Sequence, residues 1–145
     1  MDASFVVSCV TREATSEAAL RLLETWLAQR AVLVAPSFML WEVGSVLKKK
    51  VHRGLVSPPM GQAALEAALE LGVTPIQGAA VTRTAWRLAH RLGLPVLYDA
   101  SYLAVAEITN AEFWTADKQL VRSLGERLSY VRLLNPEADL DAGNT

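Results

Sequence analysis

The chain has 145 residues, of which 52% are hydrophobic and 20% are charged, a composition typical of one domain with a substantial core. Its net charge of −1 excludes a strong overall attraction to nucleic acid. Three of the 15 acids lie in a base-free tail, however, so residues 1–134 carry 14 bases and 12 acids and leave room for a local basic patch. The single cysteine, Cys9, predicts a reducing, cytoplasmic compartment, and the absence of a basic leader or an apolar run of about 18 residues argues against secretion or a membrane span.

Short apolar runs and amphipathic segments alternate along the chain. Residues 5–10 fit either a strand or the first turn of a helix. Helices are expected from Thr15 or Ser16 to about 30, from a Ser37 cap to 50, over 60–71, over 79–92 and from 117 onward. Strands are expected over 31–35, 73–76, 94–97, 111–115 and 130–134. This alternation predicts an α/β domain over residues 1–134 with a parallel sheet between helices, followed by a loose polar tail over 135–145.

The stretch 94–107 carries the most chemical information. Pro95 can only begin a strand, Val96 and Leu97 continue it, and helical spacing starts after Asp99. Asp99 at such a junction has two interpretations. It is either a helix N-cap, or a functional carboxylate at the carboxyl end of a central strand, where open α/β sheets bind ligands.

The acidic residues outside the tail show a pattern. Asp2, Asp99 and Asp117 all fall near predicted strand-to-helix junctions, and Glu42 lies in mid-helix among apolar residues. They are either three ordinary caps and a half-exposed glutamate, or one cluster. A cluster would need a cation to offset repulsion, and oxygen ligands without Cys or His suit Mg²⁺ or Mn²⁺.

Two hydroxyl residues stand beside these acids in the sequence. Ser4 and Thr115 lie two residues from Asp2 and Asp117, so they are expected either to orient a carboxylate or to act as ordinary caps.

Two basic segments are candidate RNA contacts. Lys48, Lys49 and Lys50, followed by Arg53, lie nearly two helical turns after Glu42, where they either bind phosphate or complement the end of a helix. Arg83, Arg87 and Arg91 form a second stripe, interpreted first as solvent-facing and second as RNA-binding. The four tryptophans are expected mainly in the core or at an interface.

Four strings, taken in order, resemble the signatures of PIN-domain ribonucleases such as the toxin subunits of VapBC-type toxin–antitoxin pairs. They are Asp2–Ser4, Pro36-Ser37 with Trp41–Val43, Tyr98–Glu107 and Trp114–Asp117. The resemblance implies a three-layer α/β/α fold with a central parallel sheet and a Mg²⁺- or Mn²⁺-dependent endoribonuclease. It places metal-binding or supporting roles on Asp2, Glu42, Asp99 and Asp117. It also implies a homodimer and a cognate antitoxin that inserts a segment near the acidic pocket.

The chain departs from the family at its start, because only Met1 precedes Asp2 where the family has an apolar strand. Either the chain starts too late or the first strand is truncated. A truncated strand would leave Asp2 on a frayed end, which supports an alternative function as a catalytically inactive PIN-like dimerisation or RNA-binding module. A phosphatase of the Asp-x-Asp type or a receiver domain fits less well, because Ser4 replaces the second aspartate and Lys118 directly follows Asp117.

Overall fold

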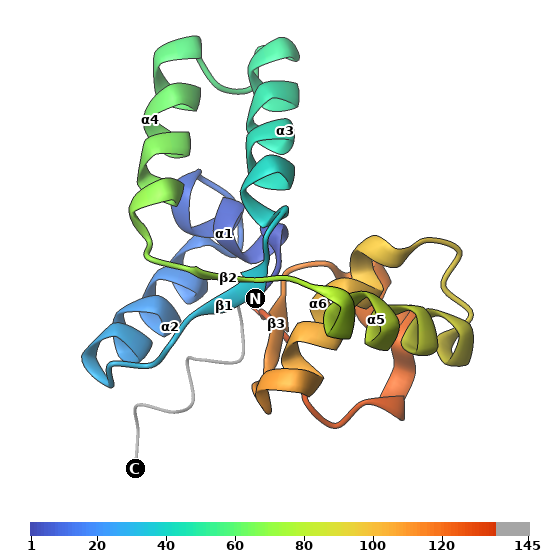
Figure 1. Cartoon of the computed structure of the whole chain (residues 1–145). Coiled ribbons are helices and arrows are strands. Elements are labelled where there is room, and N and C mark those ends of the chain that lie inside the picture. Colours follow the sequence, from blue (N-terminus) through green and yellow to red (C-terminus); the bar gives the residue numbers. More distant parts are fainter. Residues whose placement is uncertain (136–145) are drawn as a thin grey trace.

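The computed structural model describes residues 1–135, and all but the first residue of the tail predicted over 135–145 lies outside them. Helices dominate, and every strand is three residues long (Figure 1). The elements in chain order are α1 (Ala3–Val10), α2 (Ser16–Ala28), β1 (Val34–Pro36), α3 (Met39–His52), α4 (Pro58–Glu70), β2 (Thr74–Ile76), α5 (Ala79–Leu92), α6 (Leu97–Thr109), β3 (Phe113–Thr115), α7 (Lys118–Leu124), the 3₁₀ helix η1 (Gly125–Arg127) and β4 (Val131–Leu133). No helix in this described part of the chain is long and apolar enough to cross a membrane.

The strands pair in parallel, as predicted, but they form two separate pairs rather than one continuous sheet. β1 pairs with β2, and β3 pairs with β4. The first two residues lie between these pairs (Figure 1), since the Met1 nitrogen donates to the Val34 carbonyl at 3.5 Å and the Asp2 N–H donates to the Trp114 carbonyl at 3.1 Å. Asp2 is therefore held by backbone pairing, and the expected frayed end is not observed.

The predicted strand over 94–97 is wrong. Leu97 is the first residue of α6, Val96 is its extended N-cap residue, and Asp99 lies in the first turn of the helix rather than at its cap. The reason is the short apolar run at Val96 and Leu97. Val96 is 51% exposed, so the run is not a buried strand, and periodicity over so few residues cannot distinguish a strand from the start of a helix.

Other boundaries and caps moved by a few residues. Residues 5–10, left open in the sequence, belong to α1. The strand expected over 31–35 begins only at Val34, since Val32 is 75% exposed, and it ends on Pro36. Neither Ser37 nor Thr15 caps a helix with its side chain, whereas Asp2, Ser57 and Asp117 do.

The core has two parts. The larger one gathers apolar side chains of α1, α3, α4, α5 and α6, and α5 packs along α6. The smaller one surrounds Phe5 and Leu134, where Trp26 stacks on Phe5 with ring centroids 5.1 Å apart and Trp114 packs nearby. Trp41 and Trp86, in contrast, are 81% and 70% exposed. Figure 1 shows α3 and α4 projecting side by side from the rest of the fold.

Gly93 ends α5 with a left-handed backbone, at φ 71°. Replacing it with Ala is expected to lower the free energy of unfolding by about 1 kcal/mol, because a Cβ disfavours this conformation. Gly44 is the matched control, since it lies inside α3 and an added Cβ would meet Leu65 at an ordinary 3.8 Å. Gly44→Ala should raise the same quantity by about 0.5–1 kcal/mol. Urea unfolding measures both changes in the free energy of unfolding. Changes of the same sign in the two variants would contradict the left-handed conformation assigned to Gly93.

Candidate functional site

Asp2 is a buried carboxylate that accepts three hydrogen bonds. Thr115 Oγ1 donates to Oδ2 at 2.6 Å, and Ser4 Oγ and the Phe5 N–H donate to Oδ1 at 2.7 and 3.0 Å. Asp2 is only 7% exposed, so these three donors replace the water molecules that an ionised carboxylate would otherwise bind. The bond from Phe5 also makes Asp2 the N-cap of α1.

Ser4 and Thr115 connect Asp2 to the turn that follows β3. Their hydroxyl oxygens lie 3.2 Å apart, Ser4 Oγ accepts the Ala116 N–H at 2.8 Å, and Thr115 Oγ1 accepts the Asp117 N–H at 3.0 Å. Each hydroxyl thus contacts both the Asp2 carboxylate and the backbone that carries Asp117. Of the two interpretations given for Ser4, the structure shows the first, since its hydroxyl donates to the Asp2 carboxylate.

The other three acids stand on separate helices. Asp117 is the N-cap of α7, and its Oδ1 accepts the N–H groups of Gln119 and Leu120 at 2.8 and 3.0 Å. Asp99 lies in the first turn of α6, and no hydrogen bond joins its carboxylate to another group within residues 1–135. On α3, Glu42 accepts a hydrogen bond from the hydroxyl of Tyr102.

The charges of these acids act on one another. Asp99 is an exposed residue, but partial desolvation of its carboxylate raises its pKa, and the charges of Asp117 and Asp2 raise it further. Burial also raises the pKa of Glu42, the Tyr102 hydrogen bond opposes this, and the charges of Asp99 and Asp2 add to it. For Asp2, burial raises the pKa against the lowering effect of its hydrogen bonds. The structure therefore brings the four predicted acids, which are remote in sequence, into one electrostatic environment.

The acids do not form a ready-made metal cage. Within residues 1–135, no group of three or more His, Cys, Asp or Glu side chains has the arrangement needed to hold a metal ion. Their chemistry nevertheless fits a hard divalent cation, because all donors are oxygens and the repulsion that raises the pKa values of Asp99 and Glu42 would be relieved by positive charge.

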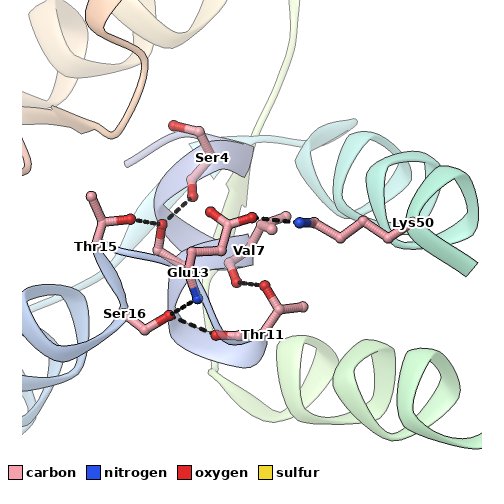
Figure 2. Close-up of polar contacts among 8 residues, drawn as sticks. Ser4, Val7, Thr11, Glu13, Thr15, Ser16 and Lys50 are labelled. Atoms are coloured by element: carbon pink, nitrogen blue, oxygen red, sulfur yellow. Dashed lines mark hydrogen bonds and ion pairs between the residues drawn. The ribbon is translucent and has the colours of Figure 1, made fainter. Parts of the chain in front are cut away.

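The predicted basic residues separate into two groups. Lys48, Lys49 and Arg53 are exposed and line a largely apolar groove of about 1050 Å³ on α3 and α4 that also contains Trp41. Lys50 instead forms an ion pair with Glu13 at 2.6 Å, which joins the end of α3 to the turn between α1 and α2 (Figure 2).

The turn that receives Lys50 is itself cross-linked by short side chains. Thr11 Oγ1 donates to the Val7 carbonyl at 2.8 Å, and Ser16 Oγ donates to the Thr11 carbonyl at 2.6 Å while accepting the Glu13 N–H at 2.8 Å (Figure 2). Because Glu13 is held in this way, the Lys50 ammonium is directed away from the groove residues.

Tyr102 is the site residue whose role the sequence analysis did not assign. It is 4% exposed, and its ring contacts Phe38 and Phe113 at centroid distances of 5.6 and 6.2 Å. A signal was available, since Tyr102 follows Asp99 by three residues, which places both on one side of a helix. Tyr102 also stands within the string Tyr98–Glu107 that carries the family resemblance, but no partner for its hydroxyl follows from that string.

Comparison with known proteins agrees with this arrangement. The PIN domain family model matches residues 1–124. No curated protein matches the chain. The matched range contains every acid of the site together with Ser4, Thr115 and Tyr102. The chain therefore belongs to the PIN domain family, whose members are generally nucleases.

Proposed function

We propose that this PIN domain is a Mg²⁺- or Mn²⁺-dependent endoribonuclease. The observation that carries the proposal is the gathering of carboxylates at the site: desolvation raises the pKa values of Glu42 and Asp99, and the charges that raise them further are all carboxylates. Bringing such groups together costs stability, and acids with raised pKa values cluster at functional sites. In a family of nucleases, a divalent cation and a phosphodiester are the partners that suit them best.

The four acids are assigned to hold the metal or support its ligands. When bound, the ion supplies positive charge that lowers the pKa of a water molecule and stabilises the leaving oxygen. Thr115 and Ser4 fix both oxygens of Asp2, and Tyr102 fixes Glu42. Asp99 has no such restraint within the described residues, so its side chain is able to rotate toward an incoming cation.

Substrate contacts are assigned to the exposed cations next to the site. Lys48, Lys49 and Arg53 would bind backbone phosphates, which position RNA without reading its sequence. Lys50 was predicted with them, but its ion pair with Glu13 favours a structural role in joining α3 to α1.

We further propose that the chain is the toxin of a toxin–antitoxin pair, active in the cytoplasm as a homodimer. The resemblance supports this, and so does the groove on α3 and α4, whose apolar lining by Trp41, Leu65 and Leu69 suits an inserted protein segment. We also propose the three-layer arrangement of the family for this fold, because Met1 and Asp2 bond to both strand pairs and would bridge them into one sheet.

Metal removal tests the enzyme assignment. RNA cleavage is expected with Mn²⁺ or Mg²⁺ and is expected to fall to background in EDTA, and isothermal calorimetry should detect Mn²⁺ binding to the wild type. Full cleavage in EDTA would contradict metal dependence. If the protein shows no RNA cleavage and no heat of Mn²⁺ binding, the result would favour the alternative, a catalytically inactive PIN-like module.

A further inference from the structure

The outward face of α5 is a second charged surface, separate from the acidic site. It presents Arg83, Trp86, Arg87, His90 and Arg91, all of which are exposed, and the indole of Trp86 is 70% exposed. The opposite face of the helix is buried in the core and consists of Val81, Ala85, Leu88, Ala89 and Leu92. The helix therefore packs against the core through its apolar face alone, and the cations on the other face do not contribute to that packing.

This surface has almost no compensating negative charge. Residues 79–92 contain no Asp or Glu, in a chain whose net charge is −1. Arg87 pairs with Glu107 of α6 at 2.5 Å, but Arg83 and Arg91 form no ion pair within the described residues. A solvated helix face normally mixes both signs and seldom exposes a large indole, so the combination indicates a binding surface.

We infer that the outward face of α5 binds an unpaired segment of RNA. Arg83 and Arg91 are eight residues apart, which is about 12 Å along the helix, and Trp86 lies between them along the axis, on the edge of the exposed face opposite Arg91. Exposed arginines that track phosphates, with an aromatic ring on which a base stacks, are the usual components of single-strand binding sites.

The location of α5 gives this surface a role in the proposed reaction, on which the inference rests. Residues 93–96 join the last turn of α5 to the first turn of α6, and the two helices pack side by side (Figure 1). The first turn of α6 carries Asp99. RNA held along α5 is therefore held on the helix pair that presents one of the four acids, which would add substrate affinity outside the site itself.

The test is RNA binding without catalysis. Full-length Glu42→Gln protein is titrated in EDTA against a fluorescein-labelled, unstructured RNA oligonucleotide, and affinity is read from fluorescence anisotropy. Adding Trp86→Ala should weaken binding about fivefold or more, since stacking contributes on the order of 1–3 kcal/mol per base. Trp86→Phe should retain most of the affinity. Arg83→Gln with Arg91→Gln should reduce the slope of log affinity against log salt by about 1.4, which is two phosphate contacts on a single strand.

Arg30→Gln is the control, because it removes one arginine charge from an exposed residue outside α5. It should leave the salt slope unchanged. Unchanged affinity in Trp86→Ala, or equal effects of the α5 and Arg30 substitutions, would overturn the inference. The two proposals fail separately. Trp86-dependent binding without cleavage by the wild type would remove the nuclease assignment alone, whereas cleavage with normal RNA affinity in the α5 variants would remove only this surface.

Discussion

Asp99→Asn is expected to reduce RNA cleavage at least about 100-fold, the lower range of what a charged catalytic group contributes. The substitution keeps the size of the side chain and removes its charge. Because the structure gives the Asp99 carboxylate no hydrogen bond within residues 1–135, no local contact is lost. Single-turnover cleavage with excess enzyme at saturating Mn²⁺ separates loss of chemistry from loss of RNA binding.

The same variant is expected to be at least as stable as the wild type. The pKa of Asp99 is raised in the folded state, so folding favours its protonated form. The protonated Asp99 side chain contributes its stability at pH values below the pKa of the unfolded state. This contribution is lost as the pH rises through the pKa of the folded state, so the charged carboxylate is destabilising at pH 7. Asp99→Asn should therefore raise the thermal midpoint at pH 7, and this gain should disappear near pH 3.

Added cation provides the control for this interpretation. A divalent ion that binds only the folded wild type should raise its thermal midpoint by mass action, with a smaller rise for Asp99→Asn. Glu42→Gln should behave similarly, because the pKa of Glu42 is raised by burial and by the charges of Asp99 and Asp2. A variant with full activity, or one much less stable than the wild type at pH 7, would contradict the role given to Asp99.

Thr115→Val is expected to produce the largest loss of stability among these changes, about 2–3 kcal/mol. Thr115 is fully buried, and its hydroxyl donates to Asp2 at 2.6 Å while accepting the Asp117 N–H at 3.0 Å. Valine fills the same space but leaves a buried carboxylate oxygen and a backbone N–H without partners. Activity should fall as well, because Asp2 loses a contact that orients it and lowers its pKa.

Thr115→Ser is the matched control, since it keeps the hydroxyl and removes one methyl group, at a cost of about 1 kcal/mol. Urea unfolding and cleavage assays on both variants separate packing from hydrogen bonding. We expect Thr115→Ser to retain activity and Thr115→Val to lose it. Equal activity in the two variants would show that the hydroxyl only packs.

Much of the local structure was predictable because it depends on short-range chemistry. Gly93 was expected to end the helix over 79–92, and it does so with the left-handed backbone that glycine adopts readily. The helical spacing in α2 and α4 and the cap at Asp117 followed from residues close in sequence. The segment before Asp99 did not, because the apolar run at Val96 and Leu97 is too short for its pattern to distinguish a strand from the start of a helix.

The candidate site shows the same division. Asp2, Glu42, Asp99 and Asp117 were selected from motif order, and the structure places them where their charges interact. The ion pair between Lys50 and Glu13 joins residues that are 37 positions apart in the sequence. The hydrogen bond from Tyr102 to Glu42 joins residues that are 60 positions apart. No pattern in a single sequence specifies which of several possible partners a side chain will meet at such separations.

The sequence by itself indicated the PIN family, selected the four candidate acids and located most helices to within a few residues, because these depend on residue type and near-neighbour spacing. Only the tertiary structure decided that Asp2 is anchored between two strand pairs, that Lys50 is occupied by an ion pair and that Trp86 is exposed on a cationic helix face. The physical reason is that burial and pairing depend on how distant helices pack, and the free energy of each such contact exists only once the chain has folded.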